Sequence, residues 1–175
     1  MKGVIVACLK ELVEGEFGKD KWEAVLEGAG VANGASYLPI SDVDDAVVMK
    51  LVSATCSVLG ITQQQAADAF GRQWACSYAP KMYGAYFIGI ESAKEFLLKL
   101  DGIHVSTTRA IINARPPRFV YEDLGGDALT MEYHSDRALM PFFVGLVKGL
   151  AEHYGEKADI TPLSATKVKI VLSQA

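Results

Sequence analysis

The sequence lacks several features that would assign it to a common class of proteins. Its three cysteines, Cys8, Cys56 and Cys76, are far apart and odd in number, which argues against a disulfide framework and favours reduced thiols in a cytoplasm. No apolar run reaches the roughly 18 residues that a membrane-spanning helix needs. No GxGxxG, P-loop, HExxH or CxxC motif occurs. We therefore expect a soluble, cytoplasmic globular domain without a familiar nucleotide or zinc signature.

The chain also lacks a large excess of either positive or negative charge. Lys and Arg number 17 against 21 Asp and Glu, which gives a net charge of −4 without a basic stripe. This balance argues against a nucleic-acid partner. Hydrophobic residues make up 50% of the chain, enough to line an internal cavity as well as to fill a core.

Periodicity and capping residues predict an α+β fold in one domain of 175 residues. Helices are expected over about 2–17, 20–28, 42–59, 62–78, 92–109 and 141–153. Strands are expected over about 118–121, 128–135, 157–161 and 167–172. We predict a helical N-terminal lobe, about 1–60, and an α/β lobe, about 61–175, with a four-stranded antiparallel sheet.

The run Tyr133-His134-Ser135-Asp136-Arg137 carries the clearest chemistry. If it is a β-strand, Tyr133, Ser135 and Arg137 share one face and His134 points to the opposite, surface-facing side. That face holds two hydroxyls and a guanidinium with no acid among them, which suits a ligand with carboxylates or phosphates. Together with a lone upstream imidazole, His104, the row describes a haem site.

Five ordered motifs make the chain resemble the haem nitric oxide/oxygen-binding (H-NOX) family, the haem domain shared with soluble guanylate cyclase. The family signature Tyr-x-Ser-x-Arg is matched by Tyr133, Ser135 and Arg137. The other motifs are the start Met-Lys-Gly-Val-Ile-Val, Phe70-Gly71-Arg72-Gln73, Leu100-Asp101-Gly102-Ile103-His104 and Pro116-Pro117. The resemblance covers nearly all of the chain.

The resemblance implies one non-covalent b-type haem buried between the two lobes. It implies that His104 is the iron ligand and that Tyr133, Ser135 and Arg137 hold the haem propionates. Pro117 aligns with the family proline that presses on the porphyrin, although a simple rigid turn would also explain it. Without the resemblance, the simplest interpretation of His104 is a histidine at the edge of a helix face. The order of the family motifs favours an iron ligand instead.

Three i, i+4 helix pairs are expected to face the gas side of the haem. Each pair alone would be read as plain core packing, and family alignment is the reason to group them. They are Ile5 with Leu9, Trp74 with Tyr78, and Phe142 with Leu146.

The gas preference depends on hydrogen-bond donors near the bound gas. Oxygen-binding members of the family carry a tyrosine five residues after the signature arginine, and Phe142 stands at that position here. A phenyl ring donates no hydrogen bond, so the resemblance favours nitric oxide and carbon monoxide. The alternative is an oxygen-binding member in which Tyr78 or Trp74 supplies the donor.

The resemblance implies a binding module rather than an enzyme. Nitric oxide binding would weaken the iron–histidine bond and shift the lobes, which relays the signal to a partner such as a histidine kinase, a cyclic-di-nucleotide enzyme or a chemotaxis receptor. No membrane contact is expected. A haem enzyme acting on oxygen, peroxide or nitric oxide, and a haem-free relative that binds another small molecule or a protein, are the alternatives. The chain is either a stand-alone sensor or the sensor portion of a longer receptor.

Overall fold

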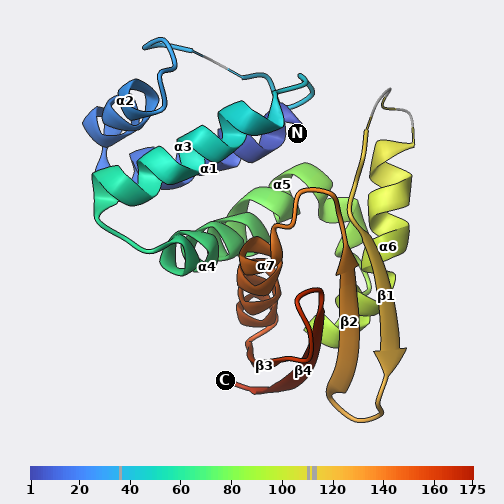
Figure 1. Ribbon diagram of the computed structural model, residues 1–175. Coiled ribbons are helices and arrows are strands. Elements are labelled where there is room, and N and C mark those ends of the chain that lie inside the picture. The colour runs from blue at the N-terminus through green and yellow to red at the C-terminus, as the bar shows by residue number, and fades with distance from the viewer. Residues whose placement is uncertain (36, 110, 112–113) are drawn as a thin grey trace.

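The first half of the chain folds into helices, as the periodicity predicts. The computed structural model describes residues 1–35, 37–109, 111 and 114–175. The helical segments of this half are α1 (Gly3–Phe17), α2 (Lys19–Gly28), α3 (Asp45–Leu59), α4 (Gln63–Gln73), the π-helical turn η1 (Trp74–Tyr78), α5 (Ala79–Tyr83) and the 3₁₀ turn η2 (Gly84–Tyr86). Figure 1 shows α1, α2 and α3 grouped at one end of the molecule, with α4 leading away from them.

Side-chain caps determine where two of these helices begin. Thr62 and Gln65 form a capping box at the start of α4, in which each side chain accepts a hydrogen bond from the other residue's N–H, at 3.2 and 2.8 Å. Helix α3 begins at Asp45, later than a cap at Ser41 or Asp42 would place it. Asp44 is the cap, because its carboxylate accepts from the N–H of Ala46 at 2.8 Å.

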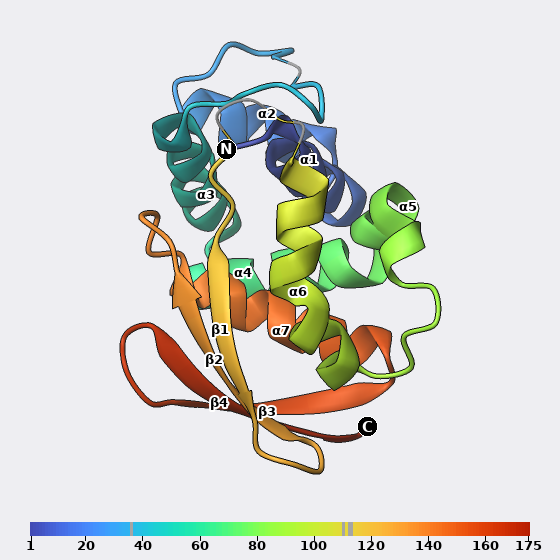
Figure 2. The same cartoon turned by 90° about the vertical axis from the view of Figure 1, so that its right-hand side faces the viewer.

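The second half of the chain carries the sheet. Its elements are α6 (Ala93–Thr108), β1 (Arg118–Asp123), β2 (Ala128–His134), α7 (Met140–His153), β3 (Glu156–Pro162) and β4 (Lys167–Gln174). The strands pair antiparallel in the order β1-β2-β4-β3. The predicted α+β fold with a four-stranded antiparallel sheet is confirmed. Figure 2 shows α6 and α7 beside the sheet and the α1–α3 group beyond them.

Buried side chains form two clusters. The first joins α1, α2 and α3 and extends to Phe70 and Tyr78 of the following helical segment. The second lies between the sheet and helices α6 and α7, with Met131, Ile170 and Val147 at its centre. Within the described ranges, no single helix is long and apolar enough to cross a membrane, although α3 and Gln63–Tyr86 pass that test together across a 108° bend.

Strand β2 ends at His134, so the prediction that Ser135 and Arg137 continue the strand is wrong. The Ser135 Oγ accepts a hydrogen bond from the N–H of Arg137 at 3.3 Å, which closes a local turn instead. Ala138 follows in the left-handed region, with φ of 49°. Tyr133 does lie on the buried face of the strand and His134 on the outer face, as expected. Ser135 and Arg137 are therefore positioned by the turn and not by strand alternation.

Candidate functional site

A cleft of about 740 Å³ opens beside the turn that follows β2. Its walls come from the first turn of α3, the segment before β1, the β3–β4 loop and the turn itself. Tyr133, Ser135 and Arg137 all line it, and Met1, Met49 and Met140 supply apolar surface. The volume lies in the range typical of cofactor-sized ligands.

Tyr133 forms the buried wall of this cleft. Its ring packs against Phe119 and Phe143, with ring centroids 5.8 and 5.7 Å away, and its N–H donates to the carbonyl of Thr166 at 2.7 Å. Strand β2 and its neighbours therefore hold this residue rigidly. Ser135 is half-buried at the edge of the same wall.

Arg137 joins the two halves of the chain across the cleft. Its Nε donates to Asp45 Oδ2 at 2.7 Å and its Nη1 donates to the carbonyl of Arg115 at 2.7 Å. The N-terminal ammonium of Met1 donates to the other carboxylate oxygen of Asp45. Burial raises the pKa of Asp45, but the hydrogen bonds from Met1 and Arg137 outweigh it, so the net pKa is lowered and the carboxylate stays ionised. The guanidinium retains further N–H groups for an anion in the cleft.

His104 lies on α6 away from that wall, against the second core cluster. Its ring stacks on Phe119 with centroids 5.5 Å apart, and Phe119 in turn contacts Tyr133. Burial lowers the pKa of His104 to about 4, against a smaller raising effect of Asp101, so the imidazole is neutral. Its Nδ1 is buried and has no hydrogen-bond partner among the described residues.

Asp101, one helical turn before His104, fastens α6 to β1. Arg118 donates to both carboxylate oxygens through Nε and Nη2 at 2.8 Å each, and the N–H of Phe119 donates at 3.0 Å. The hydrogen bond from Arg118 is the main cause that lowers the pKa of Asp101 to about 2. This bidentate contact fixes the segment of α6 that carries His104.

The six residues expected on the gas side lie together. Leu9 and Tyr78 are members of the first core cluster, and Ile5, Trp74, Phe142 and Leu146 pack against it. Their aromatic rings form a row from Phe142 through Phe70 and Trp74 to Tyr78, with successive centroids 5.7, 6.0 and 5.6 Å apart. None of the six lines the cleft beside Arg137, and neither do His104 and Pro117. The expected residues thus fall into a gas-side group, a histidine group and an anion-binding wall.

These residues fit a haem. A neutral, mostly buried imidazole is the usual proximal ligand of haem iron, and the ring of His104 makes no hydrogen bond to the described residues, so no protein group competes for it. Tyr133, Ser135 and Arg137 provide donors for two carboxylates at the cleft. Half-buried Pro117 directly precedes β1, beside Pro116 of the cleft wall.

Asp45 is the site residue that sequence reasoning missed. Asp44 and Asp45 stand side by side in the sequence, but only Asp44 serves as the helix cap. Asp45 faces the cleft and binds Arg137, which lies 92 positions later in the chain. No local pattern distinguishes a carboxylate that meets a distant arginine from one that meets water.

We expect Arg137→Ala to release haem much faster than wild type does. A hydrogen bond to a charged group contributes roughly 1.5–3 kcal/mol, which corresponds to about a 10- to 100-fold change in affinity. Haem transfer to apomyoglobin measures the rate. His134→Ala is the control, because this neighbouring side chain also borders the cleft but is half-exposed, and its nearest charged partner is Glu132 at 3.6 Å. Equal transfer rates from the two variants would show that Arg137 does not bind haem.

The sequence and the fold are similar to those of known haem-NO-binding proteins. The family model for Haem-NO-binding proteins matches residues 2–162. The chain is 26% identical over 168 residues to soluble guanylate cyclase gcy-32 of Caenorhabditis elegans, and the match covers 92% of this chain and 24% of that protein. The chain thus spans about a quarter of the length of this curated relative.

Two solved structures are similar over nearly the whole chain. One is a Cs H-NOX mutant with 4-cyano-L-phenylalanine at site 5, with a TM-score of 0.86 and 25% identity over 99% of this chain and 97% of that one. The other is an oxygen-binding H-NOX domain related to soluble guanylate cyclases, in its oxygen complex, with a TM-score of 0.85 and 25% identity over 99% and 96% of the two chains.

Proposed function

Because the chain belongs to the haem-NO-binding family of H-NOX gas-sensor domains, we propose that it binds one non-covalent b-type haem and senses nitric oxide. The domain is a binding module, and any cyclase activity of its longer relatives lies elsewhere in those chains. The observation that carries the haem assignment is the mostly buried, neutral imidazole of His104, whose side chain makes no hydrogen bond to the described residues, in a chain with the intact Tyr133, Ser135 and Arg137 signature.

His104 would hold the iron and the cleft wall would hold the propionates. Haem, when bound there, would supply an iron that binds diatomic gases. The Asp101–Arg118 pair keeps α6 against β1 and so orients the imidazole. Arg137 offers free N–H groups to a propionate, while Tyr133 and Ser135 add hydroxyl donors. Pro117, directly before β1, would press on the porphyrin, as the family resemblance implies.

The gas preference follows from the side chains of the gas-side group. Phe142 has no hydrogen-bond donor, and its ring packs edge-on against Phe70 at 5.7 Å. Bound oxygen gains from a donor, whereas nitric oxide and carbon monoxide need none. The alternative is oxygen sensing with Tyr78 or Trp74 as donor, which their place in the same aromatic row supports. A haem enzyme is less favoured, because the gas-side group has no His or Arg to cleave an O–O bond.

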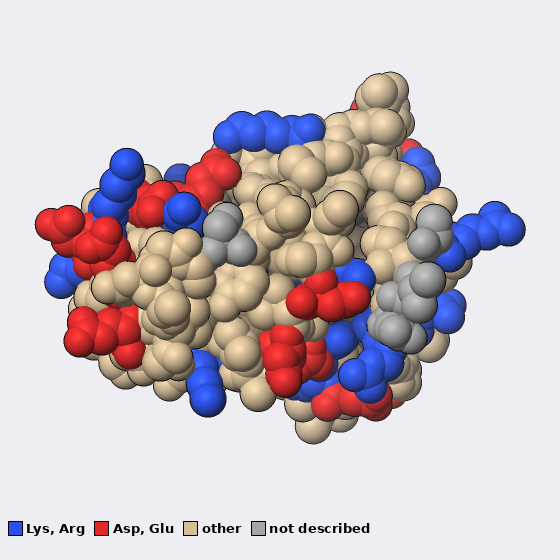
Figure 3. All heavy atoms as spheres, turned by 90° about the horizontal axis from the view of Figure 1, so that it is seen from above, with Lys and Arg blue, Asp and Glu red and all other residues tan. Residues whose placement is uncertain are grey.

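The link between Arg137 and Asp45 offers a route for the signal. Asp45 begins α3 in the helical half, and Arg137 follows β2 in the half that carries the sheet. A change in the propionate contacts of Arg137 would alter its pairing with Asp45 and so shift the balance between two arrangements of the lobes. We propose that a signalling partner, such as a histidine kinase, a cyclic-di-nucleotide enzyme or a chemotaxis receptor, reads this shift. The face seen from above mixes acidic and basic side chains over a largely uncharged surface (Figure 3), so charge of one sign does not define the contact there.

The absorption spectrum of the reduced protein tests the proposal. We expect a five-coordinate ferrous spectrum that changes on adding nitric oxide or carbon monoxide and forms no lasting oxy complex in air. A colourless protein that takes up no added haem would contradict the haem assignment. A stable oxy spectrum abolished by Tyr78→Phe would establish the oxygen-sensing alternative.

Phe142→Tyr is expected to raise oxygen affinity. The substitution places one phenol near the bound gas, and a buried neutral hydrogen bond contributes roughly 0.5–1.5 kcal/mol, or a factor of about 2–13. Oxygen titration of the reduced variant and wild type measures the change. Phe87→Tyr is the control, because that half-buried ring packs against Phe96 and His153, away from both the gas-side group and His104. Unchanged oxygen affinity in Phe142→Tyr would place position 142 away from the gas.

A further inference from the structure

The π-helical turn η1 carries both Trp74 and Tyr78. In this turn the N–H of Ala79 donates to the carbonyl of Trp74, five residues back, instead of the usual four. Such turns are rare and concentrate at functional sites. Pro80 provides the local reason, since it has no N–H and its ring would collide with the carbonyl four residues earlier in a continuous α-helix. The wider turn relieves that collision but is intrinsically less stable than α-helix.

Glu11 of α1 holds both flanks of this turn. Gln73, the residue directly before η1, donates from Nε2 to Glu11 Oε1 at 3.1 Å. Lys81, in α5 directly after η1, donates from Nζ to the same oxygen at 3.3 Å. One carboxylate from a helix about 60 residues upstream thus bridges the two ends of the irregular segment.

Tyr78 lies at the Glu11 side of the aromatic row. Its ring stacks on Trp74 at 5.6 Å with an interplanar angle of 21°, while Phe142 lies at the other end of the row, beyond Phe70. Burial raises the pKa of Tyr78, and Cys8, Glu11 and Tyr83 raise it further, so the phenol stays protonated and can donate a hydrogen bond. The π-turn sets the backbone position of this donor, and Glu11 holds both ends of the turn.

We propose that Glu11 is a positioning residue that clamps the π-turn and thereby holds Tyr78 and Trp74 where neither donates a hydrogen bond to the bound gas. The inference rests on the proposed gas site and assigns its selectivity to a residue outside it. With the clamp intact, the gas-side group offers no donor and oxygen is bound weakly. With the clamp released, the turn relaxes, a donor reaches the gas, and oxygen affinity rises.

Replacing Glu11 separates the clamp from the pocket in one experiment. In Glu11→Ala, amide hydrogen exchange across residues 74–81 should accelerate by about two- to fivefold, the effect expected for losing contacts of a half-exposed carboxylate. The C–O stretching band of the ferrous carbon monoxide complex should shift, and oxygen affinity should rise by a similar factor. Glu11→Gln retains an oxygen acceptor and should restore exchange and band position most of the way to wild type.

Glu16→Ala is the matched control. Glu16 is an exposed glutamate on the same helix and has no hydrogen bond or ion pair among the described residues. It should match wild type in all three measurements. If Glu11→Ala exchanges at the wild-type rate, there is no clamp. If exchange accelerates while the C–O band and oxygen affinity stay fixed, Glu11 does not position the pocket. The exchange measurement also works on haem-free protein, so failure of haem binding is distinguishable from failure of the clamp.

Discussion

His104→Gly is expected to leave the purified protein almost free of haem. Removing a hydrogen-bonding neighbour of a metal ligand already costs about 10- to 100-fold in metal affinity, so removing the ligand itself should cost more. The ring also fills space against Phe119, with centroids 5.5 Å apart, and glycine leaves that space empty. Added imidazole should enter it and restore a five-coordinate ferrous spectrum. The haem-to-protein ratio, with and without imidazole, measures both effects.

His134→Gly provides the control for that experiment. His134 follows the buried Tyr133 on the outer face of β2 and is half-exposed, so the same substitution there removes an imidazole without opening the core. It should retain haem as wild type does. If His104→Gly kept the wild-type spectrum without imidazole, another residue would be the ligand.

The fold was predictable because its determinants are local. The capping box of Thr62 with Gln65 and the Ser92 cap, whose Oγ accepts from the N–H of Glu95 at 3.2 Å, mark helix starts that any window of four residues reveals. Pro116-Pro117 and the hairpin glycines Gly125 and Gly126 likewise determine the backbone conformation at their own positions. Helix and strand boundaries in the structure therefore follow the prediction within a few residues.

The site was predictable only in part because its contacts are distant in sequence. The family motif identified Arg137 as a site residue. No residue near Asp45 in the sequence indicates that Asp45 pairs with Arg137. The chain forms a turn at Ser135 where a continued strand was expected. The π-turn was missed for a related reason. The run to Tyr78 has ordinary helical periodicity, and Pro80 alone does not reveal that Glu11, more than 60 residues upstream, contacts both ends of the turn.

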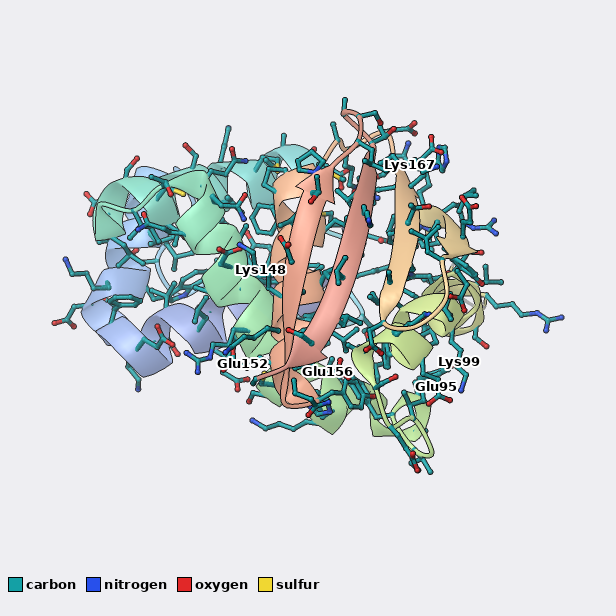
Figure 4. The ribbon with its side chains drawn as sticks, turned by 90° about the horizontal axis from the view of Figure 1, so that it is seen from below. Glu95, Lys99, Lys148, Glu152, Glu156 and Lys167 are labelled. Carbon is teal, nitrogen blue, oxygen red and sulfur yellow. The ribbon has the colours of Figure 1, made fainter. Side chains whose placement is uncertain are left out.

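Helices α4 and α7 cross at unusually close range, which makes their glycines sensitive positions. A side chain at Gly71 would collide with the backbone carbonyl of Gly145, and side chains at Gly145 and Gly149 would collide with the carbonyls of Ala67 and Gly71. Two ion pairs flank the crossing, Lys148 with Asp68 and Glu152 with Arg72. Figure 4 shows Lys148 and Glu152 along α7, on the side that faces α4.

Gly71→Ala is expected to destabilise the protein strongly for a one-carbon change. The new Cβ meets rigid backbone instead of a movable side chain, so α4 and α7 must separate, and the Phe70–Phe142 contact between them is strained as well. Overpacking of this kind costs about 1–3 kcal/mol, which for a chain of this size lowers Tm by roughly 2–12 °C. Thermal unfolding of the haem-free protein measures the change without the contribution of the ligand.

Gly15→Ala in α1 is the matched substitution with the opposite expected sign. An added Cβ at Gly15 meets no described atom within 4 Å, and its backbone is helical, so alanine only reduces the entropy lost on folding. It should stabilise the protein by about 0.5–1 kcal/mol. Since both variants exchange glycine for alanine inside a helix, helix propensity cancels between them and the difference reports the close crossing. A Tm for Gly71→Ala at or above that of wild type would show that the crossing of α4 and α7 accommodates a Cβ at position 71.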